Sequence, residues 1–266
     1  MINLLVIQAI RFNHFMNFLR RTFSTVTLCL LFSVSAESAD ESKPTQILNE
    51  LFLSDTTYPQ EKGEWQLTLS PEYEDNDEES RFSIPLSLEF GITDQLQVEL
   101  EYTPYIDISS DDDDQQGQGN IELGLQYSWV DINESGLNIA LSYSHEFANG
   151  DRAIISEAGE KPEDEDNIYV VFSKDIGANS NTQAFLQLGR ELQGNEHEDY
   201  ANTGIYSSMG NYALSMELNW TQEQSFITPG ITWALDNGWE FGLGTPIGID
   251  GNANFKLVSH ILFEWE

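Results

Sequence analysis

Apolar side chains recur at every second position over most of the chain after residue 63, and this period of two constrains the fold more than any other feature. In FSIPLSLEFGITDQLQVELEY, residues 82–102, one phase carries Phe, Ile, Leu and Val while the other carries mainly Ser and Glu. Successive side chains of a strand point to opposite faces of a sheet, so the pattern predicts strands. The link at 91–94, Gly-Ile-Thr-Asp, is short enough for a hairpin.

Twelve runs of this kind are expected, of which the sixth to the eighth alternate less clearly. They cover residues 65–73, 82–90, 96–102, 121–129, 137–143, 167–174, 182–189, 203–209, 212–220, 227–235, 239–243 and 255–265. Helical periodicity is nearly absent. Its one example is TQILNELFL, residues 45–53, where four apolar residues share a face and predict a short amphipathic helix.

The links between these runs alternate in length and polarity. Long acidic links such as IDISSDDDDQQGQGN and ANGDRAIISEAGEKPEDEDN alternate with short ones such as GITD, GN and DNG. A soluble sandwich has no reason to alternate in this way, whereas an outer-membrane barrel has long loops outside and short turns toward the periplasm. The sequence therefore predicts an all-β, transmembrane, antiparallel up-and-down β-barrel of about 12 strands.

In such a barrel the apolar phase faces lipid and the acidic phase faces the lumen, which inverts the rule for a water-soluble sheet. Aromatic residues near the ends of the runs are expected to form the interfacial girdles. They are Trp65, Tyr73, Tyr102, Tyr127, Trp129, Tyr143, Trp220, Trp233, Trp239 and Trp265.

The first 39 residues are typical of a bacterial secretory signal peptide. Arg20 and Arg21 precede an apolar run that ends in small residues, and cleavage is expected after Ala36 or Ala39. The predicted organisation is a signal peptide at 1–39, an N-terminal periplasmic segment with the short helix at 40–62, and the barrel at 63–266. The helical segment is expected to tether the barrel rather than to plug its lumen.

Composition narrows the function further. The formal net charge of the chain is −34, with 45 acidic against 11 basic residues. This balance excludes nucleic acid as a partner and favours cations, although acidic surfaces are also typical of proteins from saline habitats. The single cysteine, Cys29, lies in the predicted signal peptide without the small residues that lipidation requires. Cysteine-based metal sites and catalysis are therefore not expected.

One part of the chain resembles a known family. The run EKGEWQLTLSPEYE, the hairpin around GITDQLQV and the strand GNIELGLQYSW are similar to the outer-membrane β-barrel family named for the meta-pathway of phenol degradation. The resemblance covers residues 61 to about 130. It implies a barrel transporter in the outer membrane and suggests hydrophobic or aromatic solutes. The chain ends in FEWE, close to the aromatic ending that the barrel-assembly machinery recognises.

Eight residues of the inward phase are predicted to line a pore. They are Glu72, Glu89, Glu99, Glu101, Glu122, Glu146, Glu217 and Lys256. Rings of carboxylates in a narrow lumen favour cations. The alternative is a closed small barrel whose interior side chains hydrogen-bond to one another and conduct nothing. No cofactor and no metal site are predicted, because the acidic runs at 111–114 and 163–166 lack calcium-loop spacing.

Some twelve-stranded outer-membrane barrels are enzymes that hydrolyse lipids with Ser and His on the outer wall. The nearest stretch is YSHEFANGDR, residues 143–152. Phe147 stands two residues after His145, where those hydrolases have Ser, and Ser144 is expected to face the lumen. A triad is therefore not predicted, and the chain is not expected to be an enzyme.

The function predicted from the sequence is passive passage of a small solute through an acidic, cation-preferring lumen in the outer membrane of a Gram-negative bacterium. The alternative is a non-conducting surface protein that binds a partner or divalent cations through its acidic extracellular loops. Expected partners are the small solute, outer-membrane lipid with lipopolysaccharide, and the barrel-assembly machinery.

Overall fold

The structure is a computed structural model and describes residues 48–76, 79–110, 114–155, 162–177, 181–222, 224–235, 237–249 and 255–266. All of them belong to one compact unit, residues 44–266. The predicted signal peptide lies outside the described residues.

Nearly all regular structure is strand. The strands are β1 Trp65–Leu69, β2 Glu72–Asp75, β3 Glu79–Ser83, β4 Leu86–Thr93, β5 Leu96–Tyr102, β6 Ile106–Ser110, β7 Asp114–Gly117, β8 Ile121–Trp129, β9 Leu137–Phe147, β10 Glu165–Ile176, β11 Thr182–Gln193, β12 Glu196–Ser208, β13 Tyr212–Trp220, β14 Ser225–Ala234, β15 Trp239–Gly244, β16 Ile247–Gly248 and β17 Phe255–Trp265. A 3-10 turn, η1 Ile132–Glu134, and a short helix, α2 Arg152–Ile155, interrupt them. No helix among the described residues is long and apolar enough to cross a membrane.

Five of the barrel strands are each made of two consecutive segments. β1 with β2, β3 with β4, β5 with β6, β7 with β8 and β15 with β16 share the same neighbours on both sides. Proline stands in four of the five interruptions, at Pro71, Pro85, Pro104 and Pro246. Proline has no N–H to give to the ladder, so the strand breaks there and resumes. Counted in this way, the described residues form twelve barrel strands.

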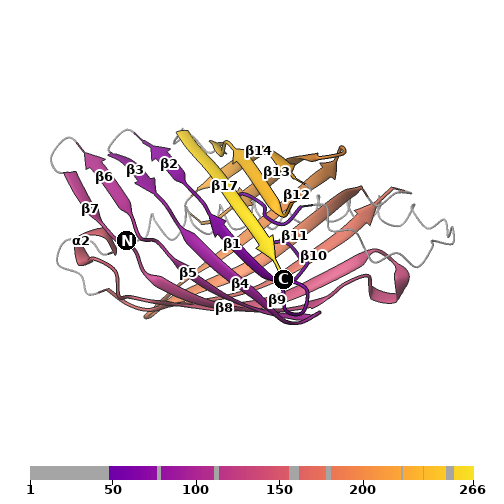
Figure 1. Cartoon of the computed structure of the whole chain (residues 1–266). Coiled ribbons are helices and arrows are strands. Elements are labelled where there is room, and N and C mark those ends of the chain that lie inside the picture. The colour runs from indigo at the N-terminus through magenta and orange to yellow at the C-terminus, as the bar shows by residue number, and fades with distance from the viewer. Residues whose placement is uncertain are drawn as a thin grey trace, which may run out of the picture. The chain divides into compact units, whose positions relative to one another are not determined.

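The twelve strands close on themselves, as Figure 1 shows. β17 pairs antiparallel with β1, with Trp265 opposite Trp65, so the last strand meets the first. Every other pairing is also antiparallel and joins neighbours in the chain. The predicted fold, a closed twelve-stranded up-and-down barrel, is confirmed.

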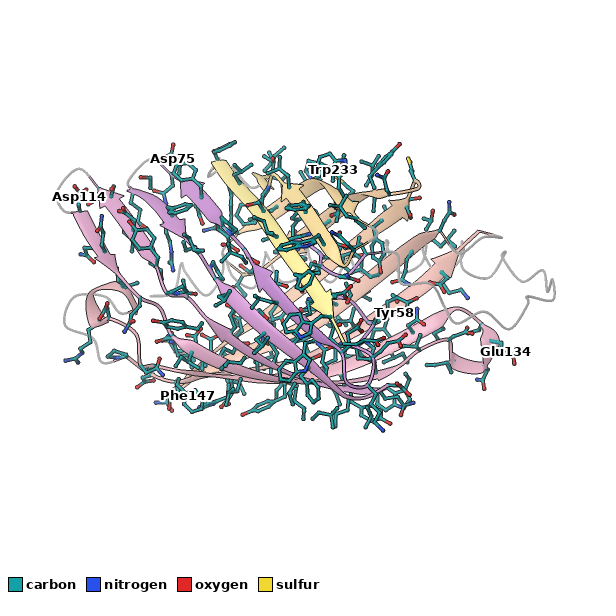
Figure 2. All side chains as sticks on the ribbon, viewed as in Figure 1. Tyr58, Asp75, Asp114, Glu134, Phe147 and Trp233 are labelled. Atoms are coloured by element: carbon teal, nitrogen blue, oxygen red, sulfur yellow. The ribbon has the colours of Figure 1, made fainter. Side chains whose placement is uncertain are left out.

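The distribution of side chains is the reverse of that in a soluble protein, with apolar residues on the outer face and polar residues on the inner face. Leu125 and Leu141 expose 45% and 49% of their surface on the outer face, whereas the inward Gln66 and Glu217 are 0% exposed. Figure 2 shows Phe147 and Trp233 on the outside of the wall and Tyr58 within the ring of strands. An apolar outer band around a polar interior is the arrangement that lipid requires.

Outward aromatic rings form a continuous belt at one end of the barrel. Phe90 contacts Trp65 at a centroid distance of 4.4 Å, and Trp65 is followed by Trp265 at 6.3 Å. The belt continues through Phe263 to Trp239, at 5.6 and 4.8 Å. This belt lies beside the short links 94–95, 209–211 and 235–238, which define the short-turn end of the barrel. Such a belt is typical of an interface between hydrocarbon and headgroups.

The opposite, long-loop end differs from the expectation in one respect. Several polar links that were predicted as loops are continued strands. QGNEHEDYAN contains only a two-residue turn, because β11 extends to Gln193 and β12 begins at Glu196. The acidic link after β5 likewise contains β6 and β7. Polar residues on both faces remove the apolar alternation that marks a strand in sequence, but the backbone still pairs beyond the lipid.

Candidate functional site: the lumen and its internal loop

All eight predicted lumen residues lie on the inner face of the wall. Their strand positions alternate with the exposed apolar residues, and Glu89 and Glu217 are only 6% and 0% exposed. Glu72, Glu99, Glu101, Glu122, Glu146 and Lys256 are partly exposed toward the interior space. The acidic phase therefore surrounds one common interior.

Four glutamates form a row around this interior. Glu101 on β5 is directly opposite Glu122 on β8, which is opposite Glu146 on β9, which is opposite Glu165 on β10. Directly opposite residues have Cβ atoms about 5 Å apart, and like charges in such pairs repel. We call these four residues the glutamate ladder. Glu165 was not among the predicted lumen residues, because its strand was expected to begin two residues later.

Positive charge inside the wall is sparse. Lys256 Nζ lies 3.7 Å from Glu72 Oε2 and 3.8 Å from Glu74 Oε2. Arg81 shares the inward phase of β3 with Ser83 and lies opposite Glu74, a position that the sequence pattern did not assign. Among the described strand residues, these two are the inward-facing Lys and Arg, and both lie apart from the glutamate ladder.

The residues before β1 form a loop inside the barrel. Residues 48–62, which we call the lumen loop, contact β9 to β15 and β17 and also β4 and β5, and then continue into β1. The loop passes so close to β4 that a Cβ on Gly91 would lie 2.6 Å from the carbonyl oxygen of Gln60. Gly63 N donates to Gly91 O at 2.8 Å. The loop therefore rises from the short-turn end and returns to it.

The carboxylate of Glu217 binds the backbone of the lumen loop. The backbone N–H groups of Phe52 and Leu53 donate to its two carboxylate oxygens, at 2.8 and 3.1 Å. Asp55 and Gln187 bond to each other next to this point, with Asp55 N donating at 3.1 Å and Gln187 Nε2 donating at 2.7 Å. Hydrogen bonds to a charged group are the stronger ones, so Glu217 is the principal anchor.

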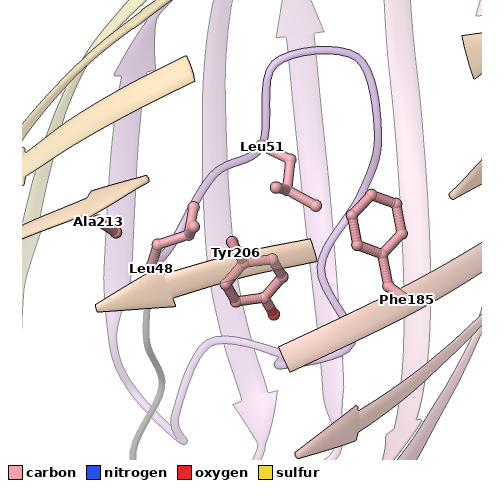
Figure 3. Packing of buried hydrophobic residues seen from close by; sticks show 5 residues of the cluster. All are labelled: Leu48, Leu51, Phe185, Tyr206 and Ala213. Carbon is pink, nitrogen blue, oxygen red and sulfur yellow. The ribbon is translucent and has the colours of Figure 1, made fainter. Parts of the chain in front are cut away.

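Apolar contacts support one side of the loop. Leu48 and Leu51 pack against Phe185, Tyr206 and Ala213, as Figure 3 shows. These three wall residues are inward-facing yet apolar or aromatic, and they lie on β11, β12 and β13. They shield the two leucines from the otherwise polar interior.

Polar contacts hold the returning part of the loop. Thr57 Oγ1 lies 2.7 Å from Ser173 Oγ, and Tyr58 accepts a hydrogen bond from Gln183 Nε2 at 3.0 Å. Gln60 donates through Nε2 to Gln66 Oε1 at 2.7 Å. Because these partners come from separate parts of the wall, the loop is seated around much of the circumference.

Spaces of different size border the loop. One, of about 60 Å³, is lined by loop residues and by Glu89, Glu99 and Glu122. At roughly 10–15 Å³ for each water centre it holds only a few waters. Another, of about 230 Å³, lies between residues 50–55 and a part of the wall that includes β2, β5 and β17. In this conformation the lumen loop occupies much of the passage.

Loop carboxyl groups are held in an unfavourable setting for charge. Burial, followed by the nearby carboxylates of Glu89 and Glu99, raises the pKa of Glu50 well above its usual range. Burial also raises the pKa of Asp55. Protonation of these groups therefore favours the seated loop.

Two expectations for the N-terminal segment are wrong. Residues 48–53 of the predicted amphipathic helix are irregular, and residues 45–47 lie outside the described residues. Residues 48–62 of the predicted periplasmic segment are inside the barrel instead of acting as a tether. The apolar spacing that suggested a helix serves instead to bring Leu48 and Leu51 against the wall.

The outward residues of the histidine stretch pair with an aspartate on the neighbouring strand. His145 Nδ1 lies 2.8 Å from Asp166 Oδ1, and Tyr143 donates to the same oxygen at 2.6 Å. Ser144 is inward-facing and 7% exposed. The side chains that a Ser-His-Asp triad must bring together thus lie on opposite sides of the wall at this point.

The fold and the lumen define a transmembrane β-barrel of the outer-membrane type with an internal loop. No family model matches the chain, and no curated protein matches it in sequence. Among solved structures, the chain is similar to an outer-membrane channel from Pseudomonas putida F1, with a TM-score of 0.62 and 10% identity over 79% of this chain and 98% of that one. It is also similar to the KdgM porin, with a TM-score of 0.54 and 10% identity over 75% of this chain and 99% of that one.

At these identities the likeness establishes the fold. The chain shares a barrel architecture with outer-membrane channels and porins. Membership of the phenol meta-pathway family remains a prediction from the sequence.

Proposed function

We propose that the chain is a passive outer-membrane channel for small cationic solutes in a Gram-negative bacterium, and that the lumen loop restricts it in the conformation described. The observation that carries the proposal is the glutamate ladder, four directly opposed carboxylates on neighbouring strands. Low-dielectric walls focus the field of such a row of carboxylates and raise the local concentration of cations.

The negative charge of the glutamate ladder also bears on which solutes the channel would admit. The KdgM porin has been solved in complex with oligogalacturonate, which is a polyanion, and a lumen with this charge would repel such a chain. The family resemblance suggests hydrophobic or aromatic solutes. The acidic interior favours those that also carry positive charge, and the chemistry of a channel requires neither cofactor nor catalytic residue.

Planar-bilayer recording of the purified mature chain in a salt gradient tests the proposal. The reversal potential is expected to show cation preference, and the triple variant Glu101→Gln, Glu122→Gln, Glu146→Gln is expected to move the cation-to-anion permeability ratio toward one. Asp199→Asn, on the outer face and paired with Arg190, is the matched control and should leave the ratio unchanged. Equal selectivity in the triple variant and the wild type would refute the proposal.

A second function is favoured by one observation, the lumen loop seated inside the barrel with spaces of about 60 and 230 Å³ beside it. In that case the barrel conducts nothing and presents its acidic loops to a partner or to divalent cations. Recording a variant that lacks residues 48–60 decides between the two. Current that appears on deletion supports the channel, and silence with and without the loop supports the surface protein.

A further inference from the structure

The side chain of Phe52, a residue of the lumen loop, occupies a narrow slot in the barrel wall. Gly230 on β14 and Gly244 on β15 are directly opposite each other. A Cβ on Gly244 would lie 2.6 Å from Phe52 Cγ, and a Cβ on Gly230 would overlap the far edge of the ring. The imidazole of His260 is stacked on the same ring, with centroids 5.3 Å apart at 24°. The missing side chains and the flat imidazole together shape a space for an aromatic ring.

The slot contains polar atoms that a phenyl ring cannot satisfy. Ser215 Oγ, Glu240 Oε1 and His260 Nε2 are buried and have no hydrogen-bond partner among the described residues. Their residues are 8%, 3% and 4% exposed. Ser215 Oγ lies 2.6 Å from the place of a Cβ on Gly230, and His260 Nε2 lies 3.3 Å from Glu240 Oε1, an ion pair when the imidazole is protonated.

Such unpaired groups need an explanation, because buried polar atoms in folded proteins are nearly always bonded. Ser215 Oγ at the edge of the ring and Nε2 of the imidazole stacked on it indicate a site that is built for a more polar occupant than Phe52. A ring that carries a hydroxyl or amino substituent could bond to atoms that the phenyl ring leaves unpaired.

The backbone of Phe52 is bound by a carboxylate while its ring lies in the slot. Its N–H donates to Glu217 Oε1 at 2.8 Å while its ring lies in the slot. The atoms that link these two contacts are the nitrogen, Cα, Cβ and the ring, which is the skeleton of a 2-arylethylamine. A carboxylate that accepts this N–H would bind a charged ammonium group more strongly.

We propose that the slot is a binding site for 2-arylethylamines, with the ring in the place of Phe52 and the ammonium group on Glu217. Phe52 is then an internal competitor that the ligand displaces. This assignment names a solute class for the proposed channel and so rests on that function. The cavity of about 230 Å³ borders both Phe52 and His260 and is lined by Glu72 and Glu101, which gives a cation a route to the slot.

Calorimetric titration of the folded mature chain in detergent tests the site, with tyramine and 2-phenylethylamine as probes. Phe52→Ala is expected to bind both amines at least about tenfold more tightly than the wild type, because a competitor that fills the slot in nine molecules of ten weakens apparent affinity by that factor. Tyramine is expected to bind more tightly than 2-phenylethylamine. Adding Glu217→Gln to Phe52→Ala should abolish the gain.

Two probes and one variant serve as controls. Butylamine lacks the ring, and 3-(4-hydroxyphenyl)propanoate replaces the ammonium group with a carboxylate, so neither should gain affinity. Phe241→Ala removes an aromatic side chain of equal size from the outer face of β15, the strand that carries Gly244, and it should not improve tyramine binding. Phe52→Leu, which keeps an apolar side chain in the loop, provides the same comparison if Phe52→Ala does not assemble.

Equal affinity of the wild type and the Phe52 variants for tyramine overturns the inference, as does equal binding of the carboxylate probe. Either result leaves the reversal-potential test untouched, so the proposed channel can stand without the slot. Tyramine binding at the slot in a barrel that shows no cation preference would instead contradict the proposed function alone.

Discussion

Replacing the principal anchor of the lumen loop gives the sharpest test of how the passage is closed. Glu217 accepts the N–H groups of Phe52 and Leu53 with its two oxygens. In Glu217→Gln the side chain keeps a single acceptor oxygen, and its amide N–H₂ faces the second backbone N–H. One hydrogen bond is lost and the other is no longer charge-assisted.

The size of the effect follows from these contacts. A hydrogen bond to a charged group contributes about 1.5–3 kcal/mol, so the substitution should weaken loop seating by about 2–3 kcal/mol. The ratio of displaced to seated loop would then rise about 30- to 140-fold. The measurement is the fraction of time that single barrels spend in their large-conductance state in a planar bilayer.

Glu146→Gln is the matched control for this experiment. Glu146 is also an inward glutamate, but it accepts a hydrogen bond from Asn120 at 2.6 Å and has no contact with the loop in the described structure. It should change ion selectivity and leave the open fraction as it is. An unchanged open fraction in Glu217→Gln would refute the view that this carboxylate seats the loop.

Three further predictions concern the same loop. Cysteines replacing Thr57 and Ser173, whose hydroxyl oxygens are 2.7 Å apart, should form a disulfide that holds the barrel in its low-conductance state until a reductant is added. Because burial and neighbouring carboxylates raise the pKa of Glu50 in the seated loop, the displaced loop releases a proton first. The seated loop is therefore most stable below the ordinary pKa of a Glu carboxyl, about 4.3, and becomes less stable as the pH rises from there toward the raised pKa. The open fraction should rise over this pH range, and Glu50→Gln should make that rise smaller. Gly244→Ala should raise the open fraction at every pH, since its Cβ would lie 2.6 Å from Phe52 Cγ, and an unchanged recording would contradict the packing described.

The barrel could be predicted from the sequence because lipid imposes a strict pattern on the outer face. Leu123, Leu125 and Tyr127 alternate with polar residues for the simple reason that each second side chain of β8 meets hydrocarbon. The same argument placed the lumen-facing glutamates on the inner side. Strand ends were less predictable, because residues beyond the lipid are wet on both faces and lose the alternation.

The lumen loop could not be predicted from its own residues. Leu48, Leu51 and Phe52 match a helical spacing as well as an irregular loop, and their partners lie more than a hundred residues away in the sequence. A signal was nevertheless present in the wall. Phe185 and Tyr206 place aromatic rings in the inward phase, which is why those strands alternate poorly, and apolar residues inside a polar lumen indicate that something apolar packs there.

The lumen loop continues into β1 through residues 63 and 64, so the element that obstructs the passage is covalently part of the wall that it obstructs. Because the connection is so short, the effective concentration of the lumen loop at its binding position stays of millimolar order even after the loop is displaced. Each barrel should therefore reseal on its own, at a rate that does not depend on how many copies share the membrane. Diluting the protein should therefore not increase the open fraction. A free peptide with the sequence of the loop would need a concentration of the same millimolar order to compete with the loop for its position in the lumen.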